Sequence, residues 1–370
     1  MRSVPQHQPT PSQTPVQPVP VAARTTRKVQ RVAGWGVALL CAVGVAIPVN
    51  FVTEEPGPTF NTIGEYQGHQ LISIEGEKTY PVSGNLDMTT VSVAGGPNTT
   101  ITALQALGTW LTPSSSVYPS DLLYEPSVTR DQVAQRNTAD MTNSQEIAQA
   151  AAMDYLKKPV GEKLIVVEVN DDGAGVGKFE EGDLIKKIGD KNIETFPQIA
   201  EVLDANKDKP IDVVVERDGQ DLTVNVTPTY NEKAKHYVMG LFINRDYDFP
   251  FTVNSGLEDV GGPSAGMMFA LGIIDELTEG HMTGGIHFAG TGTIETDGKV
   301  GKIGGIEQKM VGAQKSGATV FLAPEGNCDD VIGHIPNGLS VVKVGKLEDA
   351  VKAVEEIGEG KDPADFPTCK

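Results

Sequence analysis

The feature that most limits how this chain can fold is a run of 21 residues without a charged side chain, VAGWGVALLCAVGVAIPVNFV at positions 32–52. One helix of that length and apolarity is long enough to cross the hydrocarbon core of a bilayer. Four basic residues stand shortly before the run: Arg24, Arg27, Lys28 and Arg31. After the run no basic residue follows until Lys78. Because basic flanks stay on the cytoplasmic side, we expect a single-pass membrane helix with residues 1–31 in the cytoplasm and the remainder outside.

A cleavable signal peptide is the alternative interpretation, because Gly44-Val45-Ala46 has the small-x-small pattern of a cleavage site. The apolar run continues to Val52, and the leading segment is long for a signal peptide, which favours the membrane helix. In both cases the bulk of the chain is extracytoplasmic. The segment before the run is rich in Pro, Gln, Thr and Val, and this composition predicts a disordered tail over residues 1–31.

The charge of the chain is uneven. Residues 1–52 contain five basic residues and no Asp or Glu, so the rest carries 25 basic against 49 acidic residues, a net charge of −24. Such a surface repels phosphate backbones, which excludes nucleic acid as a partner. In the exported part, Cys328 and Cys369 either form a bridge that ties the C-terminal tail (358–370) to the body, or remain free thiols.

Residues 158–228 differ in character from their surroundings. They read as strand, glycine-rich loop, strand, helix, strand and strand, and the stretch EEGDLIKKIGDKNI resembles a bacterial PDZ domain. That resemblance implies capture of extended peptide ends by strand addition, with backbone amides receiving the terminal carboxylate. We expect the carboxylate site in the loop KKPVG, residues 157–161. Upstream, NSQEIAQAAAMDYLKK has helical spacing with Ser144 placed as its cap.

The stretch EDVGGPSAGMMFALGII places Ser264 directly before an apolar helical pattern. Pro263 suits the first turn of a helix, so Ser264 lies where unpaired backbone amides and the helix dipole favour negative charge. A nucleophile with an oxyanion site at the amides of Gly262, Ser264 and Ala265 needs that setting. A simple helix cap has the same pattern, so the stretch by itself does not decide between the two.

The base that would activate Ser264 is not a histidine. None of the six histidines has the sequence setting of a known triad, and no G-x-S-x-G elbow surrounds the serine. The stretch IGGIEQKM offers Lys309 on a helix entered through a Gly-Gly turn. Lys309 acts as a base near neutral pH only if burial lowers its pKa from ~10.4 to about 7. An exposed lysine such as Lys315 does not meet this condition.

The motifs GGPSAG, AGTGTI and GKVGKIGGI followed by Lys309 resemble the proteolytic domain of Lon-type Ser-Lys peptidases, and in particular the membrane-anchored, PDZ-containing YlbL family. The resemblance implies that Ser264 is the nucleophile, that Lys309, 45 residues later, is the general base, and that Thr291 binds and orients the amine. It further implies an α+β proteolytic domain over residues 60–157 and 229–357, interrupted by the PDZ domain. No cofactor or metal is required.

Two departures and two alternatives accompany this interpretation. Gly261 stands where many cytoplasmic relatives carry an acidic residue, and the chain has no G-x-x-x-x-G-K-[ST] phosphate loop, so we expect no nucleotide and only flexible or unfolded substrates. A catalytically silent, membrane-tethered PDZ scaffold is one alternative, but it would not need both Ser264 and Lys309. An HtrA-like protease would need a histidine base and G-N-S-G-G, which is absent. Homo-oligomers are compatible with the sequence.

Overall fold

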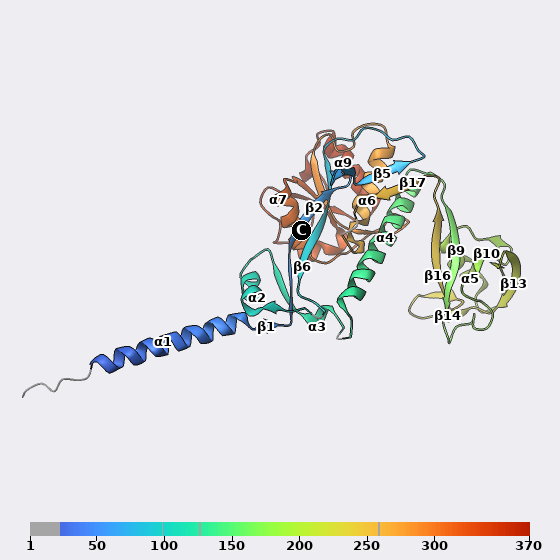
Figure 1. Ribbon diagram of the computed structural model, residues 1–370. Coiled ribbons are helices and arrows are strands. Elements are labelled where there is room, and N and C mark those ends of the chain that lie inside the picture. The colour runs from blue at the N-terminus through green and yellow to red at the C-terminus, as the bar shows by residue number, and fades with distance from the viewer. Residues whose placement is uncertain (1–22, 98, 126, 258–259) are drawn as a thin grey trace, which may run out of the picture.

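The computed structural model describes residues 23–97, 99–125, 127–257 and 260–370 (Figure 1). Its first element is the helix α1 (Ala23–Ala46), followed by the short strand β1 (Pro48–Val49) and the long strand β2 (Phe51–Asn61). The prediction of a helix over residues 32–52 is therefore wrong at its C-terminal end, because α1 ends at Ala46. Pro48 has no amide hydrogen and disfavours helical backbone at the residue before it, and Val52 is fully buried in a sheet.

The start of α1 also differs from expectation. Residues 23–31, predicted to be disordered, are helical, while the rest of the predicted tail lies outside the described residues. In the part of the chain that the structure describes, no helix combines the length and apolarity that crossing a membrane requires.

A six-stranded mixed sheet organises most of the molecule. Its order is β22 (Ser340–Val344), β21 (Val320–Pro324), β18 (His287–Gly290), β6 (Asn85–Ala94), β2 and β8 (Ser116–Pro119). The first four strands are parallel, and β2 and β8 add antiparallel pairs. Strands from both halves of the chain thus share one sheet, and the mixed α+β class predicted from sequence is confirmed.

Both faces of this sheet are covered. Helices α4 (Arg130–Tyr155), α6 (Gly266–Leu277) and α9 (Leu347–Gly358) lie on one face, and α7 (Ile306–Ser316) and α8 (Cys328–Val331) lie on the other (Figure 1). Side chains alternate accordingly along β21: Val320 and Leu322 join the first core, while Phe321 and Ala323 join the second. Helices α6 and α7 therefore lie on opposite faces of the sheet, and each is near the ends of the sheet's central strands.

The chain segment between α4 and β17 forms a second sheet with its own hydrophobic core. Its order is β13 (Gln220–Val226), β12 (Ile211–Arg217), β10 (Leu184–Ile188), β9 (Gly161–Val169) and β16 (Leu241–Asp248), with β11 (Lys191–Asn192) beside β10 and helix α5 (Phe196–Asn206) packed on it. We call this the second unit, residues 161–248. The boundary predicted at residue 228 is too early, because β16 pairs with β9 over its whole length.

The prediction that residues 157–161 receive a peptide carboxylate is also corrected by the pairing of β16 with β9. Residues 157–161 lead into β9, which is an inner strand with β10 on one side and β16 on the other. The edges of this sheet are β13 and β16, and only an edge strand has backbone groups free to add a peptide. The prediction missed this because β16 starts 80 residues after β9 starts, so their pairing is not local.

Short elements complete the fold. Two-stranded pairs are formed by β1 with β7 (Ile101–Thr102), β3 (Glu65–Tyr66) with β4 (His69–Gln70), β5 (Ile72–Glu75) with β17 (Thr252–Ser255), β14 (Thr229–Asn231) with β15 (His236–Val238), and β19 (Thr293–Ile294) with β20 (Val300–Gly301). The remaining helical elements are α2 (Ala103–Trp110), α3 (Ser120–Leu123) and the 3₁₀ turns η1 (Pro263–Ala265), η2 (Glu325–Asn327) and η3 (Pro363–Asp365).

Helix α4 begins earlier than predicted. Its cap is Thr129, whose hydroxyl accepts from the Gln132 amide while the Gln132 side chain accepts from the Thr129 amide. With this capping box at the start and no Gly or Pro within the helix, nothing stops it before Tyr155. Ser144, predicted as the cap, is instead buried in the middle of α4.

Cys328 and Cys369 form a disulfide across 41 residues, which closes the alternative of two free thiols. It anchors the C-terminal tail against the core beneath α7. Because the bridge restricts a long loop in the unfolded chain, we expect Cys328→Ser/Cys369→Ser to lower the free energy of unfolding by about 2–4 kcal/mol, measured by urea denaturation. Reductant should destabilise the wild type by a similar amount and leave the double variant unchanged. Equal stability with and without the bridge would contradict this.

Candidate active site

Ser264 lies in the 3₁₀ turn η1, which continues directly into α6. Gly262, just before the turn, has φ +96°, a backbone conformation that suits glycine. Every residue of α6 is buried: the apolar positions as their pattern predicted, and also Asp275 and Glu276, which the pattern did not predict. Ser264 is therefore held at the start of a fully buried helix.

Lys309 lies one turn into α7, which begins after Gly305 with φ +66°. Its side chain is only 2% exposed. Lys309 Nζ is 2.7 Å from Ser264 Oγ and 2.9 Å from Thr291 Oγ1. The structure thus brings together three residues that are up to 45 positions apart in the chain.

The hydrogens in this cluster have a definite direction. The Thr291 hydroxyl donates to the carbonyl oxygen of Ser264 at 3.0 Å, so its oxygen is left to accept from the Lys309 amine. A neutral amine that donates to Thr291 can aim its lone pair at the Ser264 hydroxyl. This arrangement is what proton abstraction from Ser264 requires.

Burial is the main influence on the Lys309 amine, and it lowers the pKa of Lys309 to about 8. The Glu54 carboxylate opposes this and raises the pKa of Lys309. Burial in turn raises the pKa of Glu54, and the charge of Lys309 lowers it. The amine is therefore a far better base near neutral pH than a lysine in water, and Glu54 limits the effect.

Glu54 was not identified from the sequence. It lies on β2, and one of its carboxylate oxygens is close to Gly305, where helix α7 begins. A helix N-terminus favours a nearby carboxylate. No motif marks the position, since its proximity to Lys309 depends on how β2 pairs in the sheet.

Helix α4 supports the turn that carries Ser264, and this was also missed. The amide of Gly262 donates to the carbonyl oxygen of Asn137 at 2.9 Å, and the Ser144 hydroxyl donates to the carbonyl oxygen of Pro263 at 3.1 Å. The Gly262 amide is therefore already used, which corrects its prediction as an oxyanion donor. Ser264 and Ala265 lie in the first turn of a helix, where amides have no intrahelical partner.

Ser264 and Lys309 open into a cleft of about 430 Å³. Its apolar lining residues include Phe60, Tyr66, Met88, Met141 and Val260. Thr89, Thr90 and Val91 of β6 also line it, and β6 is bonded to β18 only over Asn85–Met88. The cleft thus combines an apolar wall with the part of β6 that is not paired with β18, beside the Ser264 hydroxyl.

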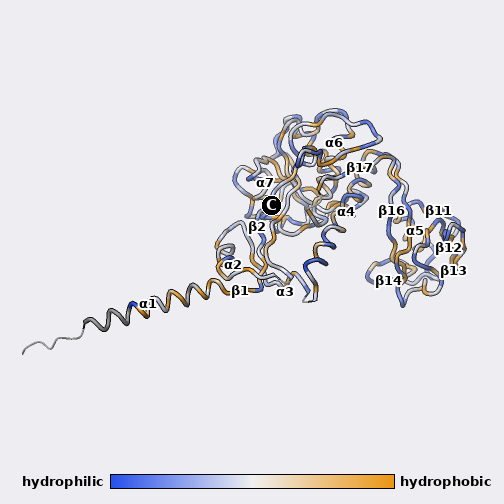
Figure 2. Tube along the Cα trace, viewed as in Figure 1, coloured by the Kyte–Doolittle hydropathy of each residue, from blue (hydrophilic) through white to orange (hydrophobic). Residues whose placement is uncertain are grey.

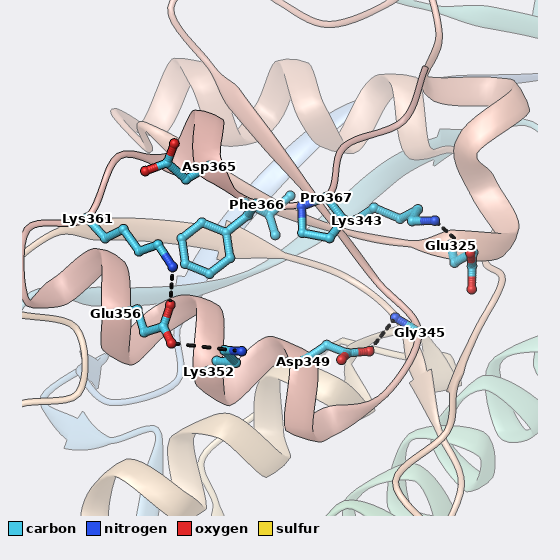
Figure 3. A pocket seen from close by; sticks show the side chains of 11 residues that line it. Glu325, Lys343, Gly345, Asp349, Lys352, Glu356, Lys361, Asp365, Phe366 and Pro367 are labelled. Atoms are coloured by element: carbon cyan, nitrogen blue, oxygen red, sulfur yellow. Dashed lines mark hydrogen bonds and ion pairs between the residues drawn. The ribbon is translucent and has the colours of Figure 1, made fainter.

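A second pocket, of about 380 Å³, lies between α9, β22 and the C-terminal tail (Figure 3). Its charged groups bond to one another: Lys361 with Glu356, and Lys343 with Glu325. Lys361 also lies 4.8 Å from the centre of the Phe366 ring. The contacts of Lys361 join the tail to α9, and the Lys343–Glu325 pair joins β22 to η2. Within the described residues, no group of three or more His, Cys, Asp or Glu side chains is arranged to hold a metal ion.

Comparison with known proteins gives one family. Residues 228–356 match the Lon protease (S16) C-terminal proteolytic domain. Lon protease of Campylobacter concisus is 27% identical over 146 residues, 38% of this chain and 18% of that protein. Lon protease of Geobacter metallireducens is 30% identical over 135 residues, 36% of this chain and 16% of that protein. The chain therefore spans less than a fifth of the length of these relatives.

Among solved structures, the PDZ domain of an SdrC-like protein from Listeria monocytogenes is 16% identical with a TM-score of 0.21, and covers 22% of this chain and 85% of its own. The PDZ domain of the corresponding protein from Listeria innocua gives the same identity and score over 22% of this chain and 93% of its own. Residues 228–356 are therefore similar to a Lon-type (S16) proteolytic domain.

Proposed function

We propose that the protein is an ATP-independent serine endopeptidase in which Ser264 is the nucleophile and Lys309 the general base. The observation that carries this is the 2.7 Å contact between the Lys309 amine and the Ser264 hydroxyl, with the amine buried. An ordinary helix cap would not place a buried lysine against its hydroxyl, because burying a lysine without a role costs free energy. The Lon-type domain match supports the same reaction.

The reaction begins when the neutral Lys309 amine takes the Ser264 proton as Oγ attacks a peptide carbonyl carbon. Negative charge then develops on the carbonyl oxygen, and the amides of Ser264 and Ala265 stabilise it at the start of α6. Lys309 gives the proton to the leaving amine, which breaks the C–N bond and leaves an acyl-enzyme. Water, deprotonated by Lys309, hydrolyses this ester and restores both groups. Thr291 keeps the amine oriented throughout.

The substrates we propose are flexible or unfolded segments of extracytoplasmic proteins. The cleft admits a chain segment rather than a folded domain, and the sequence has no phosphate loop with which ATP would drive unfolding. The uncharged run 32–52 and the basic residues before it support a single-pass membrane location with the N-terminus in the cytoplasm. In the second unit, β16 is an edge strand, and we propose that it captures peptide ends by strand addition.

The test of this function is hydrolysis of a permanently unfolded protein by the full chain, with and without ATP. We expect cleavage without nucleotide, an unchanged rate with ATP, and little cleavage of a tightly folded protein of similar size. Cleavage that requires ATP, or equal cleavage of folded and unfolded substrates, would contradict the proposal. Covalent labelling of Ser264 by a serine-directed phosphonate would identify the nucleophile independently.

The charge of Glu54 gives a further prediction. Glu54→Gln removes the carboxylate that raises the pKa of Lys309, so the amine should be neutral in a larger fraction of molecules at pH 7. We expect the acid limb of the pH–rate profile to move to lower pH and the rate at pH 7 to rise severalfold. Glu55→Gln is the matched control, since Glu55 accepts a hydrogen bond from Thr109 instead. An unchanged limb in Glu54→Gln would show that Glu54 does not act on the base.

A further inference from the structure

Residues 88–120 form a stretch of 33 positions without Asp, Glu, Lys, Arg or His. At the chain's average of 21% charged residues, a stretch of this length would contain about seven. The stretch begins within β6 and includes β7, α2 and β8. Such a composition is unusual for a surface in water. Its first four residues, 88–91, line the cleft beside Ser264, and the peptidase mechanism uses none of the others.

Helix α2 directs its apolar side chains away from the protein. Leu104, Leu107 and Trp110 are 55%, 48% and 69% exposed. The polar Thr109 is buried instead, and its hydroxyl donates to Glu55 on β2. A helix on a water-exposed surface shows the opposite arrangement, with apolar residues inside. Leu111 and, on α3, Leu122 and Leu123 extend the same exposed group. We call these six side chains the α2 patch.

The α2 patch continues the apolar surface of α1. Strand β1 follows α1 directly and pairs with β7, and the amide of Ala103 donates to the carbonyl oxygen of Ile47 at 2.9 Å. Helix α2 therefore starts beside the end of α1, and apolar colours run from one into the other (Figure 2). On α1, Trp35 is 78% exposed and Leu39 is 66% exposed.

These features fit a lipid surface better than a protein partner. An exposed apolar group of this extent marks an interaction site, and protein interfaces add a charged or polar rim that contributes to orientation. Residues 88–120 supply no charged group for such a rim, and Asp121, beside Leu122 on α3, is a single exposed carboxylate at the edge of the patch. A bilayer interface instead favours leucine with tryptophan and tyrosine, as at Trp110 and Tyr118, and needs no charge complement.

We propose that the α2 patch lies in the interfacial layer of a lipid bilayer, on the same membrane that the apolar surface of α1 contacts. The patch would hold the proteolytic domain against the membrane surface, with Trp110 at the level of the lipid headgroups. Because α2 packs on β2 and β8 of the main sheet, this contact fixes the orientation of that sheet toward the bilayer. The proposal rests on the membrane location proposed above for residues 32–52 and does not depend on the peptidase activity.

The two tryptophans of the chain, Trp35 and Trp110, allow a direct test. The full chain with Trp35→Phe is reconstituted in phosphatidylcholine vesicles, with or without bromine on the upper acyl carbons of the lipid. We expect Trp110 emission to be blue-shifted and quenched by the brominated lipid. The matched variant Trp110→Phe reports Trp35, and Trp35→Phe/Trp110→Phe/Tyr230→Trp places a probe on the second unit, which should remain unquenched.

Each other outcome overturns the proposal. Unquenched Trp110 with red-shifted emission would mean that the α2 patch faces water. Unquenched but blue-shifted emission would mean that protein covers it, for example a second copy of the chain. In Leu104→Gln/Leu107→Gln/Leu111→Gln, made on the Trp35→Phe background, we expect quenching of Trp110 to fall while hydrolysis of a soluble unfolded protein is unchanged. Quenching that persists in this variant would also count against the patch.

Discussion

Replacing Ser264 or Lys309 with alanine is expected to lower the rate of peptide hydrolysis by about 10⁴-fold or more, because nucleophile and base act as one unit. The two side chains are 2.7 Å apart and both act in the same proton transfer. For the same reason the double variant should be no slower than either single variant. Lys309→Arg should be equally inactive, since a guanidinium does not lose its proton near neutral pH.

The control for these variants lies on the same helix. Lys315 is an exposed lysine of α7, and Lys315→Ala should retain the wild-type rate. The measurement is the initial rate of cleavage of an unfolded protein at pH 8 and 9. If Ser264→Ala or Lys309→Ala cleaves as fast as Lys315→Ala, the catalytic assignment is wrong.

Loss of folding would be a trivial cause of inactivity, and Lys309→Met separates it from loss of the base. Lowering a lysine pKa from 10.5 to about 8 destabilises the folded state at pH 7 by about 3 kcal/mol. Methionine fills a similar volume without this cost. We therefore expect Lys309→Met to be inactive and at least as stable as the wild type in urea denaturation. An inactive variant that is also less stable would leave Lys309 with a structural role.

The residues that sequence analysis identified are those marked by a local pattern. Ser264 stands in a Gly-Pro-Ser-Ala-Gly turn before an apolar helix, and Lys309 follows a Gly-Gly turn, so each could be found from its neighbours and from the resemblance of the motifs. To predict that the two residues are in contact, one must also know the pairing of β6 with β18 in the sheet, which brings η1 and α7 near each other. That step came from the resemblance and could not come from spacing.

The residues that it missed are joined to the site by non-local pairing. Glu54 reaches Lys309 because β2 pairs with β6, and a shift of one residue in that pairing would turn its side chain to the other face. Asn137 and Ser144 reach the Ser264 turn because α4 runs unbroken past it. The helical pattern around Ser144 was recognised, but the earlier start at Thr129 was not, so a buried donor was interpreted as a cap.

The pH dependence of the reaction is the second large effect that the structure predicts. Only the neutral amine of Lys309 can accept the Ser264 proton, and its pKa is lowered to about 8, mainly by burial. Below that pKa the neutral fraction falls about tenfold for each pH unit. We therefore expect the rate to rise about a hundredfold between pH 6 and a plateau near pH 9. In water, with a pKa near 10.4, the rise would continue well beyond pH 10.

The profile is measured as kcat/KM for an unfolded substrate, because this ratio reports the ionisation of the free enzyme. The chain should remain folded over the range, which far-UV circular dichroism can check at each pH. Lys315→Ala should give the same midpoint as the wild type, and Glu54→Gln a lower one, since its carboxylate raises the pKa of Lys309. A rate that is highest in acid, or one that does not change between pH 6 and 9, would exclude a lysine base. The direction of the limb thus tests the chemistry, and the displacement of its midpoint in Glu54→Gln tests whether β2 sets the charge of the site.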